Sequence, residues 1–252
     1  MKEAIIFLHG MVGNQSVFKK EKEKLKKQYY CISYDFYNSE SLGVDHPFSL
    51  EILLEQLYDQ YKKHNIKRAH ICTLSFGCII GMAFARKYPD MVISLTFIGG
   101  YCSGVPSELQ TNRIQLLKEK SNFEYEEWLR KFANSVNTNK EQIPEDSEDI
   151  FVKSALLLHP NVFEKALRLQ LEFDSRAALL ELKMPILWVM GEYDELYKET
   201  LKDLKKYVPH VDYKEIKCAG HVAHIHQPEQ FMIFFKQFLQ KVNKREKILL
   251  IG

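Results

Sequence analysis

The sequence predicts an α/β fold with a mostly parallel central sheet of about six strands, flanked by helices. Short apolar runs typical of strands alternate along the 252-residue chain with segments that have helical spacing of apolar residues. Strands are expected near residues 4–8, 29–34, 69–74, 93–98, 185–190 and 211–216. Because strands that alternate with helices are joined by right-handed crossovers, they should form a parallel sheet.

Two of the helices have clear apolar patterns. The helix between the second and third strands has one apolar face with i, i+3, i+4 spacing, and Ser49 is placed to cap its N-terminus. That face consists of Leu50, Leu53, Leu54, Leu57, Tyr58 and Tyr61. Residues 76–88 are apolar on nearly all sides and stop at Pro89, as expected of a helix packed directly on the sheet.

The alternation of strands and helices breaks between residues 104 and 180. This segment is rich in leucine, phenylalanine and charged residues, has almost no glycine, and should form about four helices. The chain is therefore expected to consist of a core, residues 1–103 and 181–252, and an inserted helical segment, residues 104–180.

One serine lies at the predicted turn between the third strand and the helix that follows it. The turn reads Thr-Leu-Ser-Phe-Gly over residues 73–77, and it would expose the Ser75 hydroxyl above the helix N-terminus. Backbone N–H groups there favour a developing anion. Thr73 departs from the first glycine of the G-x-S-x-G pattern. Taken alone, this segment is equally compatible with an ordinary turn serine.

The first strand runs directly into His9-Gly10, and this strengthens the case for Ser75. A glycine-containing loop at that point can aim a backbone N–H at the space above the serine. The N–H groups of Met11 and Phe76 would then form a two-donor oxyanion hole. Each donor of this kind contributes roughly 100- to 1,000-fold in rate.

Two further loops carry a carboxylate and a histidine. The strand near 185–190 leads to Asp194, and Gly220-His221 precedes the C-terminal helix. The chain order serine, acid, histidine is one of the known orders of a catalytic triad.

With these segments the chain resembles an α/β-hydrolase with a lid, from the broad family of small serine esterases. The resemblance is carried by Phe7-Leu8-His9-Gly10, Leu74-Ser75-Phe76-Gly77, Met184-Pro185, Gly191-Glu192-Tyr193-Asp194 and Gly220-His221 through Pro228-Glu229. It implies that Ser75 is the nucleophile, His221 the general base and Asp194 the acid that orients the imidazole. It also implies that the helical insertion of residues 104–180 is a lid.

The residue types fit that chemistry. A serine hydroxyl needs an imidazole to remove its proton, and a carboxylate on the other ring nitrogen fixes the required tautomer. Glu192 and Glu195 are alternatives for the acid. His224 and His226 are interpreted as surface or supporting histidines at the start of the C-terminal helix.

The expected activity is hydrolysis of a carboxylic ester of a small or medium, partly apolar substrate through an acyl-enzyme. An apolar ceiling could include Tyr101, Trp128, Phe132, Leu156, Leu157, Phe163 and Leu167. Of these, Tyr101, Trp128 and Leu157 are the predicted substrate-binding residues, although each could instead hold the lid helices together. A thioesterase, a lactonase, a carbon–carbon hydrolase, a lyase and a cofactor-free perhydrolase remain open, as does a non-catalytic binding protein. The absence of aspartate at position 75 counts against dehalogenase and epoxide-hydrolase chemistry.

Composition narrows the class of partner. The net charge of +2 gives no reason to expect nucleic acid binding. The five cysteines are scattered and lack metal-ligand spacing, which favours free thiols in a reducing cytosol. No apolar run approaches the ~18 residues of a membrane span. A cytoplasmic monomer or homodimer acting on a small-molecule ester is expected, with no metal, cofactor or membrane.

Overall fold

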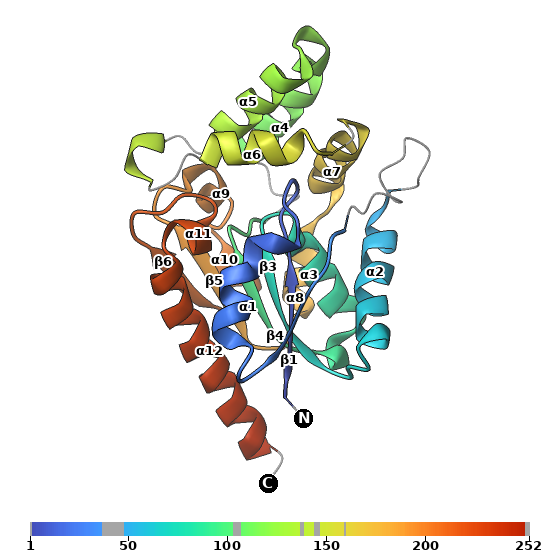
Figure 1. Cartoon of the computed structure of the whole chain (residues 1–252), viewed down its shortest axis with the longest axis vertical. Coiled ribbons are helices and arrows are strands. Elements are labelled where there is room, and N and C mark those ends of the chain that lie inside the picture. Colours follow the sequence, from blue (N-terminus) through green and yellow to red (C-terminus); the bar gives the residue numbers. More distant parts are fainter. Residues whose placement is uncertain are drawn as a thin grey trace.

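The computed structural model describes residues 2–36, 48–102, 107–136, 139–143, 147–158 and 160–249. Within them, six parallel strands form one sheet in the order β2-β1-β3-β4-β5-β6 (Figure 1). The strands are β1 (Ala4–Leu8), β2 (Tyr30–Ser33), β3 (Ala69–Leu74), β4 (Val92–Ile98), β5 (Ile186–Gly191) and β6 (Asp212–Ile216). The predicted fold class is confirmed, and strand ends differ from the prediction by about one residue, within ordinary assignment scatter.

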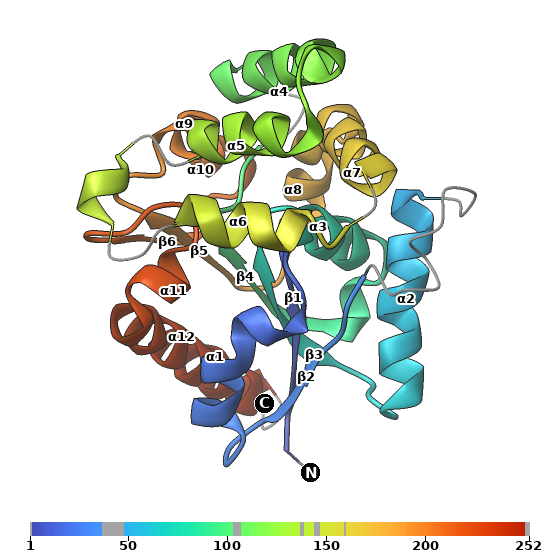
Figure 2. The same ribbon diagram turned by 45° about the horizontal axis from the view of Figure 1, so that its top comes forward.

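Helices cover both faces of this sheet. On one face lie α1 (Lys19–Leu25) and α12 (Pro228–Leu249), and on the other lie α2 (Leu50–Lys63) and α3 (Gly77–Lys87) (Figures 1 and 2). Side chains alternate along a strand, so Ile5 belongs to the apolar cluster of α1 and α12 while Ile6 belongs to that of α2 and α3. The sheet therefore separates two apolar cores.

The two helices with clear apolar patterns form as predicted. In α2, the Ser49 hydroxyl accepts a hydrogen bond from the Ile52 N–H at 3.3 Å, which caps the helix. In α3, every residue from Gly77 to Ala85 is buried. The helix ends before Pro89, which begins a short 3₁₀ turn.

The remaining helices lie mostly at the carboxyl ends of the strands. Helices α4 (Glu108–Glu119), α5 (Tyr125–Val136), α6 (Ser147–Ala155) and α7 (Pro160–Glu172) lie above this edge of the sheet (Figures 1 and 2). Helix α8 (Ser175–Glu181), which the prediction placed in the lid segment, packs on α3. The short helices α9 (Glu195–Glu199), α10 (Leu204–Tyr207) and α11 (Ala223–His226) follow β5 and β6. No helix among the described residues is both long and apolar enough to span a membrane.

Glu21 is an unusual carboxylic acid, because it is buried within the core between α1 and the sheet. It is 2 % exposed, and its Oε2 has no hydrogen-bond partner among the described residues. Burial raises its pKa from 4.5 to about 7. The ionised form is therefore destabilised in the folded protein but not in the unfolded chain.

We expect Glu21→Met to stabilise the protein in a pH-dependent way. Below pH 4.5 the carboxyl is protonated in both states, and above about pH 7 the folded state carries the full cost of ionisation. The gain in free energy of unfolding should therefore grow as pH rises between these values, to roughly 1–3 kcal/mol. Urea unfolding at pH 4.5, 6 and 8 measures it, with the exposed Glu23→Met on the same helix as control. A gain independent of pH would contradict this explanation.

Candidate active site

Ser75 occupies a strained turn between β3 and α3. Its φ is +50°, in the left-handed region that residues other than glycine rarely adopt. The turn is held by two backbone hydrogen bonds of 2.8 Å, from the Ser75 N–H to the Ile98 carbonyl and from the Cys78 N–H to the Ser75 carbonyl. This geometry fixes Ser75 at the N-terminus of α3, as the sequence predicted for a nucleophile elbow.

The residues around this turn allow the strand and helix to approach closely. A Cβ at Gly77 would lie 2.6 Å from the His9 carbonyl oxygen, so only glycine fits there. A Cβ at Gly81 would lie 2.9 Å from Thr73 Cγ2. The threonine at the first position of the turn is thus accommodated by a glycine one helical turn into α3. Its hydroxyl donates to the Thr96 carbonyl at 3.1 Å.

His221 connects Ser75 to a buried carboxylate. The Ser75 hydroxyl lies 2.8 Å from His221 Nε2, and His221 Nδ1 lies 2.9 Å from Asp194 Oδ2. A carboxylate can only accept, so Nδ1 carries the proton and Nε2 is free to accept from the serine. Asp194 is fully buried and His221 is 7 % exposed, so bulk water competes little for these bonds.

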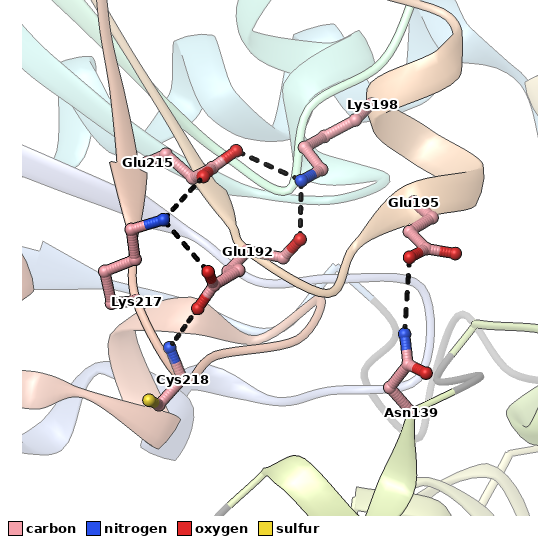
Figure 3. Close-up of polar contacts among 7 residues, drawn as sticks. All are labelled: Asn139, Glu192, Glu195, Lys198, Glu215, Lys217 and Cys218. Atoms are coloured by element: carbon pink, nitrogen blue, oxygen red, sulfur yellow. Dashed lines mark hydrogen bonds and ion pairs between the residues drawn. The ribbon is translucent and has the colours of Figure 1, made fainter.

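The two alternative acids are engaged elsewhere, as Figure 3 shows. Glu192 accepts from Lys217 Nζ at 2.9 Å and from the Cys218 N–H at 2.9 Å. Glu195 accepts from the Asn139 side-chain amide at 3.4 Å. Neither carboxylate has a hydrogen bond to the His221 imidazole, so the geometry favours Asp194.

Further contacts around Glu192 connect the loops that carry Asp194 and His221. Lys198 donates to the Glu192 carbonyl at 2.5 Å and to the Glu215 carboxylate at 3.0 Å (Figure 3). A Cβ at Gly191 would lie 2.2 Å from the Gly220 carbonyl oxygen, so the two loops touch through their backbones. The acid and the histidine are thereby held at a fixed separation.

His226 supports the His221 loop from the side of α11. Its Nδ1 accepts from the Gly220 N–H at 3.0 Å, and burial lowers its pKa to about 4, so the ring stays neutral and able to accept. His224 is buried too, stacked on Phe18 at 5.0 Å between ring centroids. Of the two readings left open for these histidines, the surface position is wrong, because α11 turns both rings inward.

His9 orients the peptide that leads to Met11. Its Nδ1–H donates to the Gly10 carbonyl at 2.7 Å, while its Nε2 accepts from the Phe36 N–H at 3.2 Å. Burial lowers the pKa of His9 to about 4, which keeps this neutral tautomer. In a trans peptide the carbonyl and the next N–H point in opposite directions. The Met11 N–H is therefore directed away from His9.

The residues of the two predicted oxyanion donors, Met11 and Phe76, lie close to the serine. Phe76 follows Ser75 directly, and a Cβ at Gly10 would lie 3.6 Å from Ser75 Cβ, so the loop that leads to Met11 passes beside the hydroxyl. Neither N–H donates to an acceptor among the described residues. Both amides are thus available to bind a developing anion.

A cavity of about 260 Å³ opens beside Ser75 and His221. Its floor comes from the loops after β1 and β3, and its roof from α5 and α6. The roof residues are Phe132, Ala133, Val136, Ile150, Phe151 and Ser154. No Asp, Glu, Lys or Arg is among the described residues that line it. The cavity suits an uncharged, largely apolar group.

The three predicted substrate-binding residues lie outside this lining. Tyr101 is buried against Tyr197, with ring centroids 5.4 Å apart. The Trp128 indole N–H donates to the Leu116 carbonyl at 2.7 Å, so it joins α5 to α4. Leu157 is 77 % exposed, after the end of α6. Composition does not reveal which face of each helix is turned to the serine, and these three side chains do not line the cavity as the structure has it. Phe132 is the member of the predicted ceiling that does.

Gly99→Ala is expected to displace the histidine. Gly99 has a φ of +56°, and a Cβ there would lie 2.8 Å from the His221 carbonyl oxygen and 2.9 Å from its ring. We expect a fall in ester turnover of roughly 100-fold, as for a misplaced reacting group. Gly100→Ala is the control, because its Cβ would meet the Trp188 ring instead. Equal activity losses in both variants would argue against a specific effect on His221.

Across the described ranges no group of three His, Cys, Asp or Glu side chains is arranged to hold a metal ion. Each of the five cysteines is a free thiol, and burial raises the pKa of Cys78, next to the serine turn, to about 12. The Cys78 thiol therefore stays protonated near neutral pH.

The alpha/beta hydrolase family model matches residues 5–232, so the chain belongs to this family. It is 20 % identical to 3-oxoadipate enol-lactonase 1 of Acinetobacter baylyi over 243 residues, covering 95 % of this chain and 89 % of that one. In structure it is similar to a thermophilic esterase from Thermogutta terrifontis, with a TM-score of 0.80, 20 % identity and coverage of 96 % and 91 %. It is also similar to 2-hydroxy-6-oxo-6-phenylhexa-2,4-dienoate hydrolase from Rhodococcus sp. strain RHA1, with a TM-score of 0.73, 16 % identity and coverage of 95 % and 91 %.

These relatives indicate the class of enzyme but not its substrate. The family and its neighbours support a hydrolase. Esterases, enol-lactonases and carbon–carbon hydrolases all occur among them, so family membership alone does not choose the bond that is cleaved.

Proposed function

We propose that the protein is a serine hydrolase that cleaves a carboxylic ester of a small or medium, partly apolar substrate. Ser75 is the nucleophile, His221 the general base and Asp194 the acid that orients the imidazole. The observation that carries the proposal is the continuous hydrogen-bonded series from Ser75 Oγ through both His221 nitrogens to Asp194, at 2.8 and 2.9 Å.

The reaction runs in two halves. His221 Nε2 takes the Ser75 proton as Oγ attacks the ester carbonyl, and the Met11 and Phe76 N–H groups stabilise the tetrahedral oxyanion. The imidazolium then protonates the leaving alcohol, and an acyl-enzyme remains on Ser75. Water, deprotonated by His221, repeats the cycle and releases the acid.

The cavity supports an apolar group on the substrate. Its roof carries Phe132, Val136, Ile150 and Phe151, and α4–α7 would act as a lid that shields the acyl-enzyme from bulk water. Transfer of apolar area into such a site contributes roughly 25 cal/mol per Å². We therefore infer that medium acyl chains bind more tightly than acetyl.

A lactone is the second candidate substrate, because a relative matched along nearly the whole chain is named an enol-lactonase. A lactone is an internal ester, so the same three side chains would act on it in the same order. The leaving alcohol would remain covalently joined to the acyl group, and the second half-reaction would release both together as one hydroxy acid.

Hydrolysis of p-nitrophenyl esters of increasing acyl length tests the proposal. We expect turnover with kcat/KM rising from acetyl to a medium chain and then falling, and a pre-steady-state burst of p-nitrophenol where deacylation limits the rate. A lactone series run in parallel ranks the two candidates. Absence of turnover with every ester and lactone would favour lyase or carbon–carbon hydrolase chemistry on this scaffold.

A further inference from the structure

Arg113, on α4, is a fully buried cation without a carboxylate partner among the described residues. Buried arginines are rare unless paired, because removing a charge from water is costly. The Arg113 guanidinium instead donates to three neutral oxygens. These are Asn112 Oδ1 at 2.6 Å, Ser135 Oγ at 2.8 Å and Tyr197 Oη at 3.0 Å. Pairing with an acid among the described residues therefore does not account for its position.

The guanidinium also lies against two aromatic rings that line the Ser75 cavity. It is 4.1 Å from the centroid of the Phe132 ring and 5.7 Å from that of Tyr197. Contacts of this kind stabilise a desolvated cation. Arg113 thus joins α4 to α5 through Ser135 and Phe132, and to α9 through Tyr197.

Tyr197 in turn lies against the histidine of the site. Its ring centroid is 4.0 Å from that of His221, with 36° between the planes, and the side chain is 2 % exposed. Tyr197 is on α9, which begins directly after Asp194. A shift of this tyrosine would therefore change the wall against which the imidazole rests.

We propose that Arg113 is a positioning residue for His221 that acts through Tyr197. The hydrogen bond to the phenol oxygen holds the tyrosine ring beside the imidazole, and the ring keeps Nε2 directed at Ser75 Oγ. This proposal rests on the proposed function, because it assigns a role in the same site. Arg113 would also link the helices above the cavity to the histidine, so the position of α4 would influence the reaction rate.

Three variants separate this role from a purely structural one. Arg113→Met removes every donor at similar length, Arg113→Lys keeps the charge but loses the planar fork, and Tyr197→Phe removes only the phenol oxygen. Arg168→Met is the control, because Arg168 is an exposed arginine on α7 that pairs with Glu164 within its own helix. Each variant is assayed below its own Tm for kcat, KM and the rate of Ser75 labelling by a fluorophosphonate.

We expect Arg113→Met to lower kcat and the labelling rate by roughly 10- to 100-fold, with little change in KM. Tyr197→Phe should lower both in the same direction, Arg113→Lys should restore part of the loss, and Arg168→Met should resemble wild type. The double variant Arg113→Met/Tyr197→Phe should lose less than the product of the single losses, because the two residues act through one contact.

Other outcomes would overturn the proposal. An unchanged kcat in folded Arg113→Met, or fully multiplicative losses in the double variant, would leave Arg113 with a packing role only. A crystal structure of Arg113→Met tests the placement without any assay, and an unmoved Tyr197 ring would contradict it. Failure of wild-type Ser75 to react with either ester or fluorophosphonate would instead count against the proposed function itself.

Discussion

Replacement of Ser75 by alanine is expected to lower ester hydrolysis by roughly 10⁴- to 10⁶-fold, since it removes the oxygen on which the proposed acyl-enzyme forms. The fold should be retained, because the β-carbon that alanine keeps already occupies this turn at a φ of +50°. The measurement is kcat/KM on the best p-nitrophenyl ester, with Tm recorded on the same sample.

Ser154→Ala is the matched control for this variant. Ser154 lines the same cavity from α6 but has no bond to His221 among the described residues. We expect it to keep activity close to wild type. If Ser75→Ala retained wild-type turnover, or if Ser154→Ala lost it, the nucleophile would have to be reassigned.

Asp194→Asn is expected to lower kcat by about 10⁴-fold with little effect on stability. The asparagine amide can donate to His221 Nδ1, which favours the tautomer with the proton on Nε2. That nitrogen could then no longer accept the Ser75 proton. Stability should change little because the two side chains are nearly the same size and Asp194 is fully buried in the packed loop. Steady-state kinetics and urea unfolding measure the two effects.

Glu195→Gln provides the comparison for the acid. Glu195 is adjacent in sequence, but its carboxylate bonds to Asn139 and not to the histidine. It should therefore have nearly wild-type activity. A larger loss in Glu195→Gln than in Asp194→Asn would transfer the orienting role to the neighbouring carboxylate.

The fold could be predicted almost completely from apolar periodicity. Buried parallel strands are short apolar runs, and β3 and β4 are buried at every position, so their limits are visible in the sequence. The apolar face of α2 and the proline after α3 were equally informative. The prediction includes most of α8 in the lid segment, whereas α8 packs on α3 in the structure. Its sequence does not indicate that contact.

The site could be predicted only where a local motif defines it. The turn around Ser75 and the loops before Asp194 and His221 have recognisable sequences, and the structure brings these three side chains together. His226 and Arg113 have no such signal. The Gly220 N–H is only six residues from His226, but the contact depends on how the loop turns back over α11. The Tyr197 hydroxyl is 84 residues from Arg113 and on another helix, so only the tertiary fold reveals that contact.

Substrate contacts were the least predictable part for the same reason. Trp128 and Phe132 lie one helical turn apart in α5, and both are buried aromatic residues. One joins α5 to α4 and the other lines the cavity, a difference that depends on how α5 is seated above the sheet. A sequence pattern shows which face of a helix is apolar, but it does not show which residues on that face point toward the serine.

Covalent labelling is the most direct test of the central claim that His221 activates Ser75. The wild-type protein is incubated with a fluorophosphonate, and intact mass and peptide mapping give the stoichiometry and the site. We expect one label per chain, located on Ser75, and a labelling rate that falls by orders of magnitude in His221→Ala. Absence of labelling in the wild-type protein, labelling of another residue, or an unchanged rate in His221→Ala would contradict it.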